Sequence, residues 1–399
     1  MNSEPTINVG AATAAAHPPS IALVGPVRPF RGGIAQYTTQ LHRTLAMKCA
    51  LRTISYHRQY PAWLYPGKSD REPDHMAYRE PRVDYLLDWR NPLSWIRTTN
   101  SIVASGCSLV LFDWWTLFWA PATALMARRL RGRGVRVTFL CHNLFDHDAG
   151  VFRRKLARSL LAQADAYLVH SSEQAAALRS SFPDKRVVTH PIPPYDQFPP
   201  PSTWLPKRGR LELLFFGFIR PYKGLDVLVD ALAWLNDPHV YLTVVGEPWC
   251  APEELRKRIE ATQAPNVELH LDYVDDQTAA NFFARADLVV LPYLSASGSA
   301  VAAMAFHYEC PILATRTGAF PDVIEEGKTG FMVHPGSPEQ LANCLRGLTR
   351  EGVASLKPNI NASKDRFTWD SLATVLIGMT GMSANPHTGS RGPRTDALA

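Results

Sequence analysis

Short apolar runs alternate with helical segments between Leu211 and Val333, and this alternation constrains the fold more than any other feature. The apolar runs have the length of buried strands and lie at 211–216, 242–246, 287–293 and 311–315. Apolar residues at helical spacing follow the first run, at Leu225, Leu228, Val229 and Leu232. Strands that alternate with helices predict a parallel sheet, which binds its ligands outside the carboxyl ends of the strands.

The loop after the first run carries two basic residues beside the start of a helix. Its sequence from Gly217 to Gly224 is GFIRPYKG, so Arg220 and Lys223 flank a helix N-terminus with free backbone N–H groups. Such a place suits a phosphate or diphosphate, although two solvated cations on an ordinary turn explain this loop equally simply. Ser295 to Ser299 form a second loop of small residues, which opens the helix predicted for 300–307.

The amino-terminal half begins with a similar pattern. A strand at 20–25 precedes a loop with Gly32 and Gly33, and a helix follows. Paired glycines let backbone approach a ligand closely at a helix N-terminus, or they form a plain turn. Arg28 and Arg31 in this loop either add charge to a site or are solvated.

His142 follows a strand predicted at 135–140, at the edge where such a sheet places its chemistry, although a bond to local backbone is the alternative. Asp146 and His147 are weaker candidates. Residues 56–100, rich in Tyr, Trp, Pro and Arg, predict a long acceptor-facing loop region with short helices. The segment 109–126 is nearly long enough to span a bilayer, but Asp113 and Pro121 favour a strand, a loop and a helix.

A length of 399 residues predicts two domains rather than one. The Pro-rich segment 191–208 is the predicted linker between an amino-terminal domain at 20–190 and a carboxyl-terminal domain at 209–380, whose last helix is able to pack back on the first domain. Residues 1–19 predict a flexible leader without signal-peptide features, and residues 381–399 predict a disordered tail. Six scattered cysteines without a CxxC pair are typical of reduced thiols in a cytosolic protein.

The formal net charge is +6, which suits acidic ligands such as nucleotide diphosphates or anionic lipids. Two basic runs, at 128–136 and 153–158, contribute much of it, and the second lies on a predicted amphipathic helix. We therefore expect peripheral contact with an anionic membrane, the alternative for each run being a solvated helix face. No nucleic acid is expected as a partner, because helix-turn-helix, zinc-finger and RNA-binding signatures are missing from the sequence.

The order of these motifs resembles the retaining nucleotide-sugar glycosyltransferases of family 4 (glycosyl transferases group 1). The motifs that carry the resemblance are Gly217–Gly224, Val244–Glu247, Ala286–Tyr293, Pro311–Thr315 and Gly318–Gly330. The resemblance implies an α/β protein with the GT-B fold, in which two Rossmann-like, doubly wound domains face each other across a cleft. It also implies a hexosyltransferase that moves a sugar from a nucleotide-diphosphate sugar to an acceptor hydroxyl with retention, in polysaccharide, glycolipid or other cell-surface glycan biosynthesis.

The resemblance also implies the roles of individual residues. His142 binds and orients the donor sugar or the acceptor, while Arg220 and Lys223 neutralise the diphosphate leaving group. The implied donor-binding residues are Gly32, Gly33, Glu247, Tyr273, Val274, Ser297, Gly298, Ser299 and Ala300. No cofactor or metal is expected, because the Asp-x-Asp motif at 146–148 lies in the wrong domain for the donor. We expect a glycan or lipid-linked acceptor, and a protein in the cytoplasm or at the inner face of the cytoplasmic membrane.

The sequence departs from the family pattern at two places. Phe218 stands where the family has an Arg, so Arg220, two residues later, is expected to supply that charge. Two Glu residues that many members carry eight apart are Ala296 and Met304 here, and the hydroxyls that they hold need other partners. Asp322 is expected to be structural. Two alternatives therefore stay open: a non-catalytic protein of this fold that binds a nucleotide or glycan, and a sugar-nucleotide epimerase.

Overall fold

The structure is a computed structural model that describes residues 20–381 except 62, 66, 74–77, 145–150, 250, 263 and 265. The predicted leader, the predicted tail beyond Gly381 and the weaker candidates Asp146 and His147 lie outside the described residues. Cys250 also lies outside them, and the other five cysteines are free thiols.

The first half of the chain forms a seven-stranded parallel sheet with the order β3-β2-β1-β4-β5-β6-β7. Its strands are β1 (Ser20–Val24), β2 (Ala50–Arg58), β3 (Val83–Asp88), β4 (Leu109–Trp114), β5 (Arg136–Cys141), β6 (Ala166–Val169) and β7 (Arg186–Thr189). The helices between them are α1 (Gly33–Ala46), α2 (Pro92–Ala104), α3 (Ala120–Arg131), α4 (Val151–Leu161) and α5 (Ser172–Ser181). The strand order reverses at β1, which pairs with both β2 and β4, so the loop after β1 lies at a topological switch point.

The second half forms a six-stranded parallel sheet with the order β10-β9-β8-β11-β12-β13. Its strands are β8 (Leu211–Phe216), β9 (Val240–Val245), β10 (Val267–His270), β11 (Leu288–Leu291), β12 (Ile312–Thr315) and β13 (Gly330–Val333). The helices up to β13 are the 3-10 turn η1 (Pro221–Lys223), α6 (Leu225–Leu235), α7 (Pro252–Thr262), α8 (Asp276–Arg285), α9 (Ala300–His307) and α10 (Phe320–Val323). After β13 come α11 (Pro338–Gly347), α12 (Arg350–Ala354), α13 (Lys357–Ser363), η2 (Lys364–Arg366), α14 (Trp369–Gly378) and η3 (Met379–Gly381).

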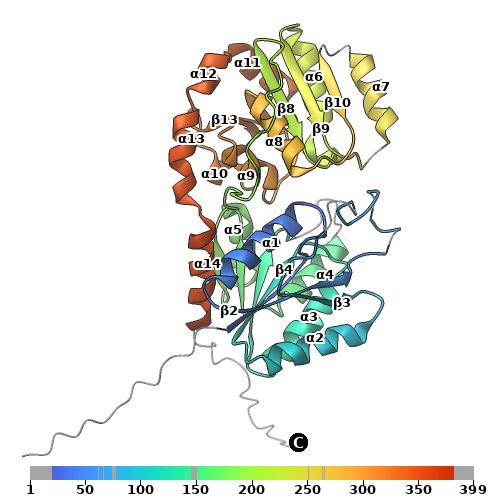
Figure 1. Ribbon diagram of the computed structural model, residues 1–399, viewed down its shortest axis with the longest axis vertical. Coiled ribbons are helices and arrows are strands. Elements are labelled where there is room, and N and C mark those ends of the chain that lie inside the picture. Colours follow the sequence, from blue (N-terminus) through green and yellow to red (C-terminus); the bar gives the residue numbers. More distant parts are fainter. Residues whose placement is uncertain are drawn as a thin grey trace, which may run out of the picture.

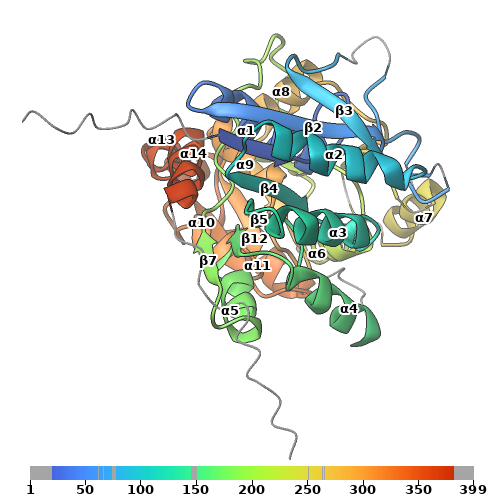
Figure 2. The ribbon, with the colours of Figure 1, turned by 90° about the horizontal axis from the view of Figure 1, so that it is seen from below.

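The two sheets lie one above the other, and helices cover both faces of each (Figure 1). Apolar side chains of α2, α3 and α4 pack on one face of the first sheet, along one side of it in Figure 2, while α1 covers the other face. The last helix, α14, runs back beside the first sheet and packs on α1. The indole of Trp369 donates to the carbonyl of Pro194 at 3.0 Å, which anchors α14 to the chain that crosses between the sheets.

Three regions differ from or sharpen the predictions. Residues 56–100 are not only a loop with short helices, since they contain the end of β2, the edge strand β3 and the 13-residue helix α2. The sequence did not indicate β3, because this edge strand begins with half-exposed and exposed residues and so lacks a continuous apolar run. The strand β7, which the sequence did not indicate, pairs with β6 and forms the other edge of the sheet. Residues 109–131 form β4 and α3, and in the described part of the chain no helix is long and apolar enough to cross a bilayer.

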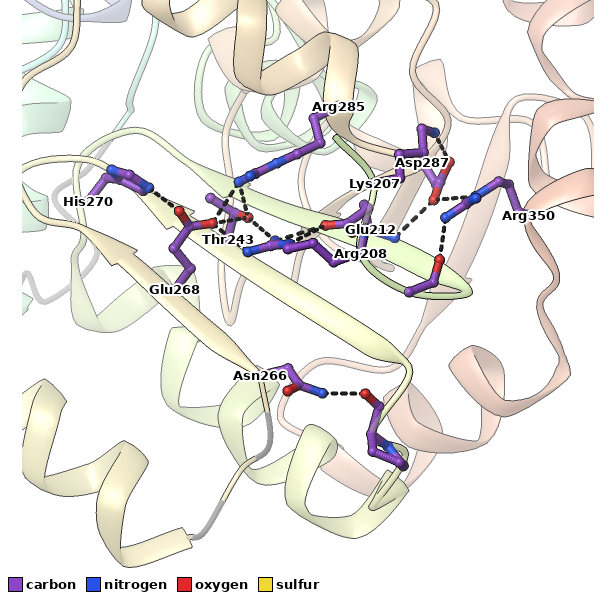
Figure 3. Close-up of polar contacts among 12 residues, drawn as sticks. Lys207, Arg208, Glu212, Thr243, Asn266, Glu268, His270, Arg285, Asp287 and Arg350 are labelled. Carbon is purple, nitrogen blue, oxygen red and sulfur yellow. Dashed lines mark hydrogen bonds and ion pairs between the residues drawn. The ribbon is translucent and has the colours of Figure 1, made fainter. Parts of the chain in front are cut away.

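A network of charged side chains holds the end of the Pro-rich segment to the second sheet (Figure 3). Arg208 bonds to the buried Glu212 of β8 and to Glu268 of β10, both at 2.8 Å. Arg285, at the end of α8, reaches the same Glu268 oxygen at 2.7 Å. Lys207 forms a separate ion pair with Asp287. The network ties β8, β10 and α8 together (Figure 3), and none of its residues lines the cleft described below, so its role is structural.

Candidate active site

A cleft of about 1370 Å³ lies between the two sheets, and every residue to which the family resemblance assigns a catalytic or donor-binding role lines it. These residues come from loops at the carboxyl ends of β1, β5, β8, β9, β10 and β11, which are far apart in sequence. The volume exceeds that of an ordinary ligand pocket, so the cleft has room for two substrates. The structure therefore brings the predicted residues together, while their roles in binding stay predictions.

The N-termini of α1 and α9 meet across this cleft. A Cβ atom on Gly33 would lie 2.8 Å from the Cβ of Ala300, so the contact between the two helices requires a glycine there. Gly32 has φ 98°, a left-handed conformation that favours glycine. The hydroxyl of Ser299 accepts from the N–H of Ala302 at 3.2 Å and caps α9. Both helices thus direct free N–H groups and positive dipole ends towards one place.

Arg220 and Lys223 are two cations without a carboxylate partner among the described residues. Lys223, which ends η1, is only 8% exposed. Burial, followed by the charge of Arg220, lowers the pKa of Lys223 to about 7. The Arg220 guanidinium lies 3.4 Å from the centre of the Trp249 ring, and burial lowers its pKa as well. Since burial without compensation disfavours both charges, an anion that bound here would be strongly attracted.

The two arginines of the loop after β1, Arg28 and Arg31, are not solvated, because both bridge to the second half of the chain. Arg31 forms an ion pair with Glu247 and lies 4.1 Å from the centre of the Tyr273 ring. Arg28 bonds to Asp276 at 2.6 Å. The backbone N–H of Lys68 also donates to Glu247, at 2.7 Å. Glu247 therefore lines the cleft as predicted, but its carboxylate is already held from the opposite side.

The loop before α9 also reaches across to the first sheet. The hydroxyl of Ser297 donates to the side-chain oxygen of Asn143, and a Cβ on Gly298 would lie 3.1 Å from the Cδ1 of Ile192. Ala296 and Met304, at the places of the usual Glu pair, both line the cleft, so neither place supplies a carboxylate. The Asp322 carboxylate accepts two bonds of 2.7 Å from the backbone and hydroxyl of Ser172 in the other half of the chain, away from the cleft.

His142 is held by a carboxylate rather than by local backbone. Its Nε2 lies 2.9 Å from Oδ1 of Asp113, a residue of β4 that is 3% exposed. The Thr38 hydroxyl lies 2.5 Å from the other Asp113 oxygen. A Cβ on Gly25 would lie 1.7 Å from that oxygen, so the glycine makes space for the carboxylate. The sequence held a signal for this pair, because Asp113 lies near the end of β4 and His142 follows β5, the neighbouring strand. At the level of sequence, Asp113 counted only against a membrane span.

Sequence reasoning also missed Tyr37, His170 and an aromatic wall. Tyr37 lies in α1 and His170 directly follows β6, which are ordinary places for core residues, but both line the cleft. The wall consists of Tyr60, Tyr65, Trp115, Phe118, Phe218 and Trp249. Trp115 donates to the hydroxyl of Tyr60 at 2.7 Å, so part of the region predicted to face the acceptor does reach the cleft. Within the described ranges, no three His, Cys, Asp or Glu side chains lie close enough together to hold a metal ion.

Comparisons with known proteins agree with this architecture. Residues 210–351 match the family described as glycosyl transferases group 1. The chain is 30% identical over 250 residues to a D-inositol 3-phosphate glycosyltransferase of Streptomyces scabiei (strain 87.22), a match that covers 57% of this chain and 56% of that protein. It is 28% identical over 219 residues to a GDP-mannose:glycolipid 4-beta-D-mannosyltransferase of Xanthomonas campestris pv. campestris, covering 54% of this chain and 60% of that protein. The chain thus spans little more than half the length of these curated relatives.

The fold is shared over nearly the whole chain with a solved structure. Sucrose-phosphate synthase from Thermosynechococcus elongatus superposes with a TM-score of 0.68 over 90% of this chain and 98% of its own, at 19% sequence identity. The predicted α/β fold, with two Rossmann-like domains that face each other across a cleft, is therefore confirmed.

Proposed function

We propose that this protein, whose residues 210–351 match the glycosyl transferases group 1 family, transfers a sugar from a nucleotide-diphosphate sugar to an acceptor hydroxyl. The observation that carries the proposal is the pair of cations without a carboxylate partner among the described residues, Arg220 and Lys223, beside the N-termini of α6 and α9. A diphosphate fits such a place, and a nucleotide sugar presents its diphosphate next to a transferable group.

In the proposed reaction, the bond between the sugar C1 and the β-phosphate oxygen breaks, the acceptor oxygen bonds to C1, and the acceptor proton passes to the departing phosphate oxygen or to solvent. The nucleoside diphosphate departs with the negative charge that develops on it. Lys223 and Arg220 stabilise that charge from a buried position, where an ion pair is stronger than in water. These cations and the helix dipoles do the work of a metal ion, so we propose metal-independent transfer, with the retention that the family resemblance implies.

Closure of the cleft supports this chemistry by excluding water. The ion pair between Arg31 and Glu247, and the bond between Arg28 and Asp276, hold the two halves of the chain together at the rim of the cleft. A donor bound behind these contacts reacts with the acceptor rather than with solvent.

For the acceptor, we propose a glycan or a lipid-linked glycan that reaches the protein at the inner face of the cytoplasmic membrane. The helix α4 exposes Phe152 (79%) and Val151 (73%) beside the exposed Arg153 and Lys155. Exposed apolar side chains among cations suit an anionic lipid surface. Phe152 and Arg153 also line the cleft, so a lipid surface at α4 would lie next to the acceptor entrance. The name of the mannosyltransferase relative specifies a glycolipid acceptor.

The donor site is tested by thermal shift of the full chain with UDP, GDP, ADP and their sugars. We expect one base to stabilise the wild type and Lys223→Met to lose that stabilisation. Lys328→Met, which removes an exposed lysine on the far loop, is the matched control and keeps it. No shift with any nucleotide would refute the donor site. Binding without transfer to any acceptor would favour the non-catalytic alternative, and turnover of the donor without an acceptor would favour an epimerase.

Membrane contact is tested separately by flotation with vesicles of phosphatidylglycerol or of phosphatidylcholine alone. We expect binding to the anionic vesicles that weakens with salt and is lost in Phe152→Ser. Leu93→Ser, which removes a 59%-exposed leucine of α2, is the matched control. Equal binding of Phe152→Ser and wild type would show that α4 does not contact lipid.

A further inference from the structure

Two histidines and a tyrosine form a cluster at the floor of the cleft. His142 follows β5 and His170 follows β6, and these strands pair in parallel with Cys141 opposite Val169. Both histidines therefore emerge at the same sheet edge. Tyr37 of α1 lies against them, with its ring centre 4.8 Å from that of His142 and 5.0 Å from that of His170. We call Tyr37, His142 and His170 the hydroxyl subsite.

The partners of the two histidines determine which ring nitrogen of each carries a proton. His142 places Nε2 against the Asp113 carboxylate, an acceptor, so this nitrogen donates. His170 places Nδ1 at 2.9 Å from the carbonyl oxygen of His190, so Nδ1 carries the proton and Nε2 keeps a lone pair. Burial lowers the pKa of His170 to about 3, which keeps its ring neutral near pH 7.

Two polar atoms of this cluster have no partner in the described structure. Nε2 of His170 and the hydroxyl oxygen of Tyr37 are both buried without a hydrogen bond. Each residue is only 1% exposed. Buried polar atoms are nearly always bonded, because an unpaired one destabilises the fold. Since both side chains line the cleft, a bound molecule is able to supply the missing bonds.

We propose that Tyr37, His142 and His170 bind the hydroxyl groups of a neutral sugar ring. This inference rests on the proposed function and narrows its substrate class. The lone pair on Nε2 of His170 accepts only from a donor, which a sugar hydroxyl supplies, and the Tyr37 hydroxyl donates or accepts beside it. A carboxylate or phosphate offers no donor at neutral pH and would face this lone pair. The subsite therefore selects a neutral sugar over a uronic acid or a sugar phosphate.

Three variants each remove one polar atom of the subsite and keep its other contact. Tyr37→Phe removes the hydroxyl and keeps the ring. His142→Gln keeps an N–H for Asp113 near the place of Nε2 and loses Nδ1. His170→Asn keeps an N–H for the carbonyl of His190 near the place of Nδ1 and loses Nε2. Because Tyr37 and His170 have unpaired atoms in the free protein, we expect Tyr37→Phe and His170→Asn to melt at or above the wild-type temperature.

The test compares dissociation constants for UDP, UDP-glucose and UDP-glucuronate by calorimetry, or for GDP and GDP-mannose where guanine is the base that binds. We expect the wild type to bind the neutral nucleotide sugar at least tenfold more tightly than UDP-glucuronate. If the donor sugar occupies the subsite, each variant weakens the nucleotide sugar about tenfold and leaves the nucleoside diphosphate unchanged. If the acceptor sugar occupies it, the variants instead weaken methyl glucoside or methyl mannoside binding to the diphosphate complex.

Two results would overturn the inference while leaving the donor site intact. One is diphosphate binding in which all three variants match wild type for every sugar ligand. The other is tighter binding of UDP-glucuronate than of UDP-glucose by the wild type. A wild type that binds no nucleoside diphosphate refutes the proposed function and, with it, the subsite.

Discussion

The charge of Lys223 makes donor binding dependent on pH in a way that can be calculated. In the empty cleft, burial and the neighbouring Arg220 lower the pKa of this lysine to about 7. A diphosphate beside it replaces the lost hydration and raises the pKa towards or beyond its ordinary value. Because the pKa is higher in the complex, binding is favoured at low pH and weakens as the pH rises through about 7.

The size of the effect follows if only the protonated lysine binds the diphosphate. With a pKa of about 7, roughly half of the free protein is competent at pH 7 and about one-eleventh at pH 8. Affinity for a nucleotide sugar should then fall about tenfold between pH 6 and pH 8, which corresponds to about 1.4 kcal/mol. Binding should take up about half a proton at pH 7 and about 0.9 proton at pH 8.

Titration calorimetry in buffers of different ionisation enthalpy measures both the affinity and the proton uptake. A nucleotide sugar is the appropriate ligand, because its two phosphates keep a constant charge over this range. Lys223→Arg keeps a permanent cation and should bind with little dependence on pH. His142→Gln removes a histidine of the cleft and keeps Lys223, so it should retain the wild-type slope. A wild-type affinity that is constant from pH 6 to pH 8, or an equally steep slope in Lys223→Arg, would refute the reasoning.

Three further predictions concern stability, each measured by urea denaturation. Burial raises the pKa of Glu268, but hydrogen bonds from His270 and Arg285 outweigh burial and lower the pKa to about 2. The stabilising contribution of Glu268 is therefore present above about pH 4.5 and is lost as the pH falls towards 2. Glu268→Gln should flatten the loss of stability at acid pH, and an unchanged loss would contradict this. Gly25→Ala should destabilise the protein by about 1–3 kcal/mol because its Cβ overlaps the Asp113 carboxylate, whereas Gly347→Ala, with open space around its Cβ, should be neutral or stabilising. Trp369→Ala should cost about 3–5 kcal/mol, and a smaller loss would mean that α14 contributes little to the fold.

The sequence predicted the part of the site that is built from backbone turns. Glycines, strand ends and the small-residue loop before α9 have local signals, and these placed Lys223, Arg220 and Ala300 in one cleft. The sequence did not reveal Tyr37 or His170, because a residue of each type usually belongs to the core, and only the meeting of α1 with β5 and β6 shows otherwise. Contacts between the two halves were hidden for the same reason, since they join residues 150 or more positions apart.

The edge strands were missed for a different reason. Buried central strands appear in the sequence as continuous apolar runs, whereas β3 and β7 mix polar and apolar residues at the margins of the first sheet. Their positions depend on pairing with β2 and β6, which the local sequence does not encode.

The return of α14 to the first sheet affects the order in which the protein is made. Leu41 and Leu45 of α1 share one apolar cluster with Leu372 and Leu376 of α14, so the first helix of the described chain is covered by its last α-helix. During synthesis, this face of α1 stays uncovered until α14 has left the ribosome. The nascent first half therefore exposes this apolar surface during translation, and we expect chaperones to bind it.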